Sequence, residues 1–168
     1  MATKSEKSKK SQRTSSAPGK SGVPDIIFAQ ASPRSQGGVS MFDVAEQITA
    51  NTVANFYSED ELLRRSALRL RDAGFEILQI TDATINIAGT PKTYQEAFNT
   101  KLYAEERPVI KPGAVETMGT FIDSPSADRP GLISVAGTPF EDVLEGVAIE
   151  EPRYEMAESM FPPLKEYW

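Results

Sequence analysis

The chain has 168 residues, of which 39% are hydrophobic, and it contains neither histidine nor cysteine. A chain of this length has room for one domain with a modest core. Without histidine it lacks the usual general base at neutral pH and the commonest zinc ligand, and without cysteine it forms neither disulfides nor thiolate metal sites. The chain therefore lacks the residues on which most hydrolase mechanisms depend. We expect no enzyme, no catalytic residue, no metal and no cofactor.

Charge is unevenly distributed along the chain. Residues 1–20 carry six Lys or Arg and one Glu, a net charge of +5, which leaves −11 for the remaining 148 residues. Because residues 1–23 are polar and rich in Ser and Lys, we expect them to be a disordered basic tail. An acidic body does not attract nucleic acid or an anionic membrane, so neither is predicted as a partner. No stretch has the apolar run of a secretory signal or a membrane span, and we expect a cytoplasmic protein.

The first predicted elements are a strand and two helices. The apolar run PDIIFAQ at 24–30 predicts the strand, and roughly helical apolar spacing over 41–53 predicts the first helix. Ser58 followed by Glu61 has the pattern of a capping box and predicts a second helix over 59–73. Gly74 then occupies the position at which helices commonly stop.

A predicted hairpin follows the second helix. FEILQI is expected to be a strand with Phe75 and Ile77 on one face and Leu78 and Ile80 on the other, so that both faces need covering. The alternating segment 84–88 is expected to pair with it as the second strand. The face with Leu78 and Ile80 is then available to a partner.

The remaining elements complete a predicted α+β fold. Thr90 and Pro91 predict the start of a helix, residues 100–106 predict the next strand, and 116–123 is a further possible strand. Helix, strand, strand, helix, strand is the core order of a ferredoxin-like βαββαβ fold, which has an antiparallel sheet with two helices on one face. We assign 24–149 to this domain and 150–168 to an extended C-terminal tail.

Two stretches resemble a known family. LRLRDAGFEILQITDATINIAGTPKTYQEAFNTKL resembles the activation prodomain of kumamolisin- and subtilisin-like serine proteases, and FIDSPSADRPGLISVAGTPFEDVLEGVAIEEPRY is similar to the prodomain-to-protease region of a bacterial group of subtilisin-family peptidases. Those proteins continue into a catalytic domain, whereas this chain ends at Trp168. We therefore expect a prodomain encoded as a separate protein.

The resemblance implies a function and a set of contact residues. It implies a stoichiometric inhibitor and folding partner of a separately encoded subtilisin-like serine protease, bound as a 1:1 heterodimer and lost by degradation when activity is wanted. The open face of the sheet would dock on the protease, and the tail would block the substrate cleft in the manner of an added strand. The residues expected in the cleft are Arg153, Tyr154, Glu155, Met156 and Ala157. Those expected on the protease surface are Leu78, Ile80, Glu105, Glu106, Met160, Phe161 and Trp168.

A second hypothesis comes from another class of function. The chain would be a ferredoxin-like regulatory or scaffold domain that binds a different protein or a small ligand, with the basic tail touching nucleic acid or membrane. This hypothesis predicts binding that weakens steeply with salt and disappears when residues 1–20 are removed. Ser124 and Ser126, which lie near acidic residues, are expected to form turns and not to act as nucleophiles.

Overall fold

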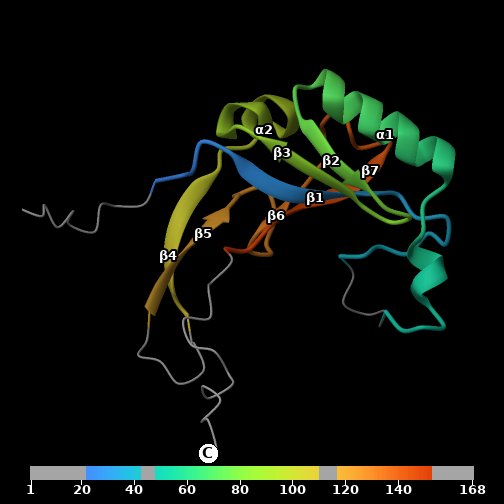
Figure 1. Ribbon diagram of the computed structural model, residues 1–168, viewed down its shortest axis with the longest axis horizontal. Helices are drawn as coiled ribbons and strands as arrows, with labels where there is room; N and C mark the ends of the chain where they lie inside the picture. The colour runs from blue at the N-terminus through green and yellow to red at the C-terminus, as the bar shows by residue number, and fades with distance from the viewer. Residues whose placement is uncertain (1–21, 43–47, 110–116, 153–168) are drawn as a thin grey trace, which may run out of the picture.

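The structure, a computed structural model, describes residues 22–42, 48–109 and 117–152. It is a mixed α+β protein, as predicted, with both helices covering the same face of an antiparallel sheet (Figure 1). The elements in chain order are β1 (Ile27–Pro33), the 3-10 turn η1 (Val53–Phe56), α1 (Asp60–Asp72), β2 (Glu76–Ile80), β3 (Ile85–Gly89), α2 (Pro91–Phe98), β4 (Tyr103–Val109), β5 (Thr117–Asp123), β6 (Leu132–Ile133) and β7 (Leu144–Ile149).

The main sheet has five strands in the order β2-β3-β1-β7-β6, and we call this sheet with its two helices the body. The strand predicted at 100–106 as the next strand of this sheet is not part of it. That segment contributes to β4, which pairs with β5 in a separate two-stranded hairpin that extends away from the helices (Figure 1). Its sequence explains the difference, because YAEERPV carries three charged residues and Pro108, which do not suit a sheet interior. The apolar strand β7 takes the place beside β1.

β1 lies at the centre of the sheet and has two different faces. Ile27, Ala29 and Ala31 are buried toward the helices, whereas Phe28 and Gln30 are exposed on the opposite face. The strand pairs antiparallel with β3 on one side and with β7 on the other. Alternation from Ile27 to Ala31 therefore separates the core from the open face of the sheet, whereas Ser32 and Pro33 at the end of β1 are both buried.

The segment before α1 is not the predicted helix. Of the residues 41–53, those at 43–47 lie outside the described residues, those at 41–42 and 50–52 form turns, and those at 48–49 have no regular secondary structure. The hydroxyls of Thr49 and Thr52 lie 3.0 Å apart, and each accepts a hydrogen bond from the other residue's backbone N–H. Such local bonds between side chains and backbone compete with helix formation.

The predicted capping box at the start of α1 does not form. Ser58 is buried, and its hydroxyl donates to the carbonyl oxygen of Pro33 at 3.2 Å instead of capping the helix. Glu59 is the N-cap residue and makes no side-chain capping bond. The prediction was wrong because the Ser58 hydroxyl, which the local pattern assigns to the helix, bonds instead to the carbonyl of Pro33 in β1, a residue distant in sequence.

Two other predicted helix signals are confirmed. After α1, the N–H of Phe75 donates to the carbonyl of Leu70 and that of Gly74 to the carbonyl of Arg71, with Gly74 at φ 96°. This pair of bonds is a Schellman motif, which needs a left-handed residue that glycine provides without a steric penalty. At the start of α2, the side chain of Thr90 accepts a hydrogen bond from the backbone, as predicted.

β2 contains a bulge that the sequence pattern does not reveal. Ile77 pairs with Ile87 and Ile80 pairs with Ile85, but the register shifts between them, so that Leu78 is the extra residue. Paired residues of an antiparallel sheet lie on the same face, and both partners here are fully buried in the core. Ile80 therefore lies on the same face as Ile77, and the predicted grouping of Ile80 with Leu78 is wrong.

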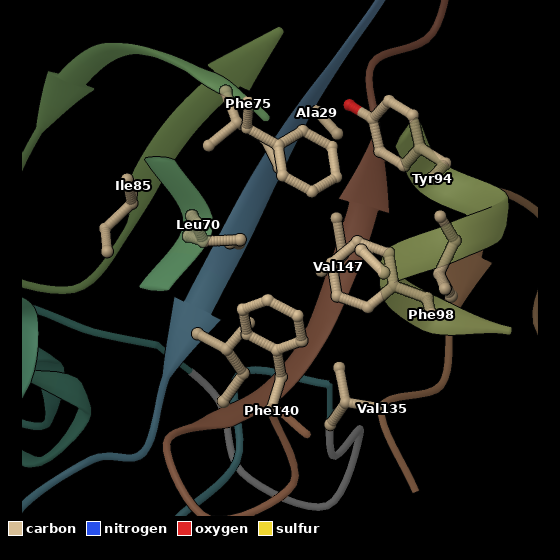
Figure 2. Close-up of a cluster of buried hydrophobic side chains, with 14 of the residues drawn as sticks. Ala29, Leu70, Phe75, Ile85, Tyr94, Phe98, Val135, Phe140 and Val147 are labelled. Carbon is tan, nitrogen blue, oxygen red and sulfur yellow. The ribbon is translucent and has the colours of Figure 1, made fainter. Parts of the chain in front are cut away.

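The core lies between the sheet and the helices (Figure 2). Phe98 is its aromatic centre, with ring centroids 5.6 Å from Phe75, 6.2 Å from Tyr94 and 5.2 Å from Phe140. Phe75 and Tyr94 meet edge to face at 4.9 Å, an arrangement that aromatic quadrupoles favour. Aromatic side chains from both layers thus join α2, the start of β2 and the loop before β7.

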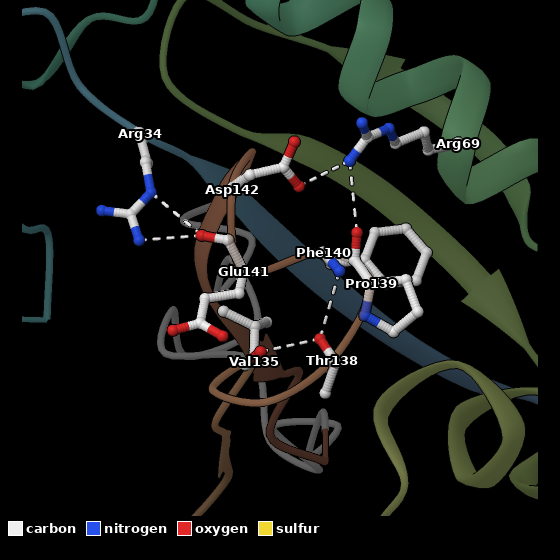
Figure 3. Close-up of polar contacts among 8 residues, drawn as sticks. All are labelled: Arg34, Arg69, Val135, Thr138, Pro139, Phe140, Glu141 and Asp142. Carbon is white, nitrogen blue, oxygen red and sulfur yellow. Dashed lines mark hydrogen bonds and ion pairs between the residues drawn. The ribbon is translucent and has the colours of Figure 1, made fainter.

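Two arginines hold the loop before β7 that provides Phe140 (Figure 3). Arg34 donates from two nitrogens to the carbonyl oxygen of Glu141, at 3.1 and 2.8 Å. Arg69 of α1 donates to the carbonyl of Pro139 and forms an ion pair with Asp142. These bonds fix the loop against the body from two sides.

Candidate functional site

Most of the predicted protease-contacting residues lie outside the described part of the chain. These are the five residues expected in the cleft, Arg153, Tyr154, Glu155, Met156 and Ala157, and three of those expected on the protease surface, Met160, Phe161 and Trp168. The structure does describe the point from which they follow. Residues 150–152 follow the end of β7 and are the last described residues before the C-terminal segment.

The four described surface residues do not gather at one place. Leu78 and Ile80 lie on β2, an edge strand of the main sheet, and each side chain is 47% exposed. Glu105 and Glu106 lie on β4, in the separate hairpin, and are also exposed. Glu105 pairs with Arg107, and Glu106 accepts a hydrogen bond from the hydroxyl of Thr120.

The described surface is hollowed beside residues 149–152, where the described chain ends. A groove of about 440 Å³ lies between the start of β1, the β4–β5 hairpin and residues 149–152. We call it the exit groove. Ile26 and Phe28 contribute large apolar surfaces that are 48% and 47% exposed, and Ile122 contributes another from β5. The groove thus joins the open face of the sheet to the hairpin.

Backbone hydrogen bonds fix the exit groove. The N–H of Glu150 donates to the carbonyl of Phe28 at 2.9 Å, and the N–H of Ile149 donates to the carbonyl of Gly131 at 2.7 Å. From the core side, the hydroxyl of Tyr94 donates to the carbonyl of Ile27 at 3.1 Å. Burial, and secondarily the charge of Glu150, raise the pKa of Tyr94 well above its ordinary value, so that this hydroxyl remains a donor.

The hairpin that forms the other wall is held by a charged network. Arg107 donates to the carboxylate of Asp123 at 2.7 Å and to that of Glu105 at 2.6 Å, and its guanidinium lies 5.3 Å from the ring centre of Phe121. Asp123 also accepts the backbone N–H groups of its neighbour Ser124 at 2.8 Å and of Gly131 at 3.0 Å. One buried carboxylate thereby ties β4, β5 and the following loop together.

The charges of this network stabilise one another. Burial opposes the ionisation of Asp123, but its two backbone donors and Arg107 together outweigh burial and lower the pKa of Asp123 below its ordinary value. The hydrogen bond that Arg107 donates to Glu105, followed by the one that it donates to Asp123, raises the pKa of Arg107. We call Glu105, Arg107 and Asp123, with the backbone N–H groups that Asp123 binds, the hairpin root. It is a charged unit whose geometry depends on an ionised Asp123.

Comparison with protein-family models, with curated proteins and with solved structures finds no match for this chain.

Polar side chains elsewhere in this region have structural partners. The hydroxyls of Thr100, Ser124 and Ser126 form a chain with successive distances of 2.7 Å, and Ser126 also accepts the N–H of Ser134. Within 22–42, 48–109 and 117–152, no three acidic side chains gather where they could hold a metal ion, and no helix is long and apolar enough to cross a membrane.

One feature of the sequence indicates the first wall of the exit groove. Ile26, Ile27 and Phe28 are consecutive apolar residues, and a strand cannot place all three on its buried face. A run of this kind at the start of a strand indicates apolar surface on the open face as well. The second wall, at Thr120 and Ile122, lies about ninety residues further along the chain, and no local pattern links it to the first.

Proposed function

We propose that this chain is a stoichiometric inhibitor and folding partner of a separately encoded subtilisin-like serine protease. The two proteins form a 1:1 complex, in which the protease is held inactive in the cytoplasm until the inhibitor is degraded. The C-terminal segment, from Arg153 to Ala157, occupies the substrate cleft. The chain itself performs no catalysis.

The proposed architecture is an elaborated ferredoxin-like unit. Helix α1 joins β1 to β2, which run in the same direction with β3 between them, and α2 leads from β3 to β7, which run in the same direction with β1 between them. Two such interlocked split β-α-β units are the essence of the ferredoxin-like arrangement. On this interpretation, β4, β5 and β6 are an insertion between α2 and the fourth strand, β7.

The observation that carries the proposal is the position of residues 150–152, which precede the C-terminal segment. They follow β7 directly and line a groove beside exposed apolar surface on the face that the helices leave open. A body that docks through this face would therefore hold the start of the segment against the same partner. This geometry, together with the two family-like stretches of sequence, supports an inhibitor whose body and tail bind one protease at once.

The inhibitory mechanism follows from the chemistry of an extended segment. Main-chain N–H and C=O groups of residues 153–157 would pair with the edge of the protease cleft, and alternate side chains would enter its pockets. Because the body binds at the same time, the tail meets the cleft at a high effective concentration. Even a modest affinity of the tail alone is then sufficient to keep the cleft occupied.

The test uses the full chain and a form truncated after Pro152. Each subtilisin-like protease encoded in the same genome is titrated with both forms, and peptide hydrolysis is measured. We expect the full chain to abolish activity of one protease at a 1:1 ratio, and the truncated form to bind that protease without blocking its cleft. Isothermal titration calorimetry gives the stoichiometry and the affinity of each form.

Two results would count against this function. If none of the proteases bound the full chain, the inhibitor hypothesis would be wrong. If the truncated form inhibited as well as the full chain, the tail would not act in the cleft. Binding that instead depended on residues 1–20 and fell steeply with salt would favour a regulatory domain directed at an acidic partner.

A further inference from the structure

The exit groove combines an apolar floor with an acidic rim. Its floor includes Ile26, Phe28 and Ile122, and the residues that line it include Glu150 and Glu151 but no Lys or Arg within the described chain. Glu106 adds a third carboxylate beside the groove, because it accepts a hydrogen bond from the lining residue Thr120. An apolar depression bordered by carboxylates favours an apolar group that carries positive charge beside it.

The arginines of this region belong to a different cavity. Arg107 and Arg129 line a hollow of about 260 Å³ that shares residues 149–152 with the exit groove. Arg107 is bound to Glu105 and Asp123, and Arg129 donates to the carbonyl of Phe42. Neither arginine lines the exit groove, so the charged side chains that line it within the described chain are the carboxylates of Glu150 and Glu151, which also border the other hollow.

The last described residue, Pro152, limits where a partner of this groove can lie. Pro152 lines the groove, and Met156, which is proposed to enter the protease cleft, is four positions further along the chain. Four extended residues span at most about 14 Å. If the tail is in the cleft, the protease surface that faces the groove therefore borders that cleft.

We propose that the exit groove binds an apolar side chain flanked by Lys or Arg on the rim of the protease substrate cleft. This inference rests on the proposed inhibitory function and gives the body a specific contact next to the tail. The β4–β5 hairpin and the open face of the sheet form the two walls of this contact. The acidic rim selects a cationic surface, and the apolar floor provides most of the affinity.

The test compares two groove variants with two matched controls in the full chain. Phe28→Ser removes apolar floor and Glu151→Lys reverses rim charge. The controls are Leu68→Ser, which removes a 54% exposed side chain from α1, and Glu96→Lys, which reverses an exposed charge on α2. Affinity is measured by calorimetry against the protease that the wild type inhibits, with its catalytic serine replaced by alanine. Circular dichroism verifies that each variant is folded.

We expect Phe28→Ser to weaken binding about tenfold or more, as loss of an aromatic anchor does. Glu151→Lys is expected to weaken it several-fold at low salt and less at about 0.5 M salt, because exposed charges are screened. Neither control should change the affinity appreciably. Replacing the Lys or Arg at the cleft rim of the protease by Glu should restore the binding of the Glu151→Lys variant.

The outcomes separate this inference from the function on which it rests. If truncation after Pro152 abolished inhibition but both groove variants bound like the controls, the groove contact would be wrong and the inhibitory function would stand. If the wild type bound no protease, both would fall. If light scattering showed a dimer of this chain that Phe28→Ser dissociates, the groove would be a self-association surface and the inference would be overturned.

Discussion

The body and the β4–β5 hairpin are held together by different forces. In the body, large apolar side chains from the sheet, both helices and the loop before β7 are buried in one cluster. In the hairpin most side chains are at least partly exposed, and the root depends on the carboxylate of Asp123, which binds Arg107, Ser124 and Gly131. The stability of the body should therefore fall when a buried side chain is made smaller, and that of the hairpin should fall when the charge of Asp123 is removed.

The largest expected effect is the loss of Phe98, which contacts three other aromatic rings in the core. Phe98→Ala removes a fully buried ring and leaves a cavity, so we expect the free energy of unfolding to fall by about 3–5 kcal/mol. Urea denaturation followed by circular dichroism measures the change. Leu68→Ala, on the exposed face of α1, is the control and should change stability by less than about 0.5 kcal/mol. Equal effects of the two substitutions would contradict the assigned core.

The hairpin is tested by removing the charge of Asp123. Because the pKa of this carboxyl is lowered in the folded protein, ionisation stabilises the fold. That stabilisation is complete above the pKa of an unfolded aspartate and is lost as pH falls through the lower folded pKa. Asp123→Asn should therefore lower the unfolding free energy by about 1.5–3 kcal/mol near neutral pH, and the difference from wild type should shrink in acid.

Hydrogen exchange shows whether this loss is local. In Asp123→Asn the backbone amides of β4 and β5 should exchange faster, while those of β1 and β3 should change much less. Uniform acceleration across all four strands would mean that the hairpin and the body open as one unit. A pH-independent difference between variant and wild type would contradict the assigned role of the charge.

Close packing in the body gives the next prediction. A Cβ atom on Gly89 would lie 2.8 Å from a ring carbon of Phe75 and 3.4 Å from one of Tyr94. Gly89→Ala should therefore cost about 1–3 kcal/mol through overpacking, measured by the same denaturation experiment. Gly22→Ala is the matched control, because nothing lies within 4 Å of its added carbon. A neutral Gly89→Ala would show that the rings shift without cost.

The parts of the fold that could be predicted from the sequence are those decided by neighbouring residues. Gly74 ends α1 and Thr90 begins α2 through bonds to residues a few positions away, so local patterns are sufficient. Ser58 failed as a predictor because its hydroxyl bonds to Pro33, and the bulge at Leu78 failed because it is defined only by pairing with β3. The place of β7 beside β1 depends on contacts between segments more than one hundred residues apart.

The candidate site divides in the same way. The sequence led us to assign Leu78, Ile80, Glu105 and Glu106 to a partner-binding surface, and all four are exposed in the described chain. It did not indicate that they lie on two different sheets, since nothing in YAEERPV specifies β5 as its partner. The exit groove was not predicted for the same reason, because its walls meet only in three dimensions.

The smallest effect concerns an ion pair of the body that contrasts with the one at the hairpin root. Arg69 and Asp142 lie 2.5 Å apart, but their side chains are 40% and 58% exposed, whereas the Asp123 side chain in the hairpin pair is 7% exposed. The hydrogen bond from Arg69 is the main cause of the lowered pKa of Asp142. Arg69→Ala should therefore raise the pKa of Asp142 toward the ordinary aspartate range. The free energy of unfolding should change little, because exposed ion pairs contribute little to stability. Carboxyl-carbon NMR titration measures the pKa, and an unchanged value in Arg69→Ala would show that the pair does not persist in solution.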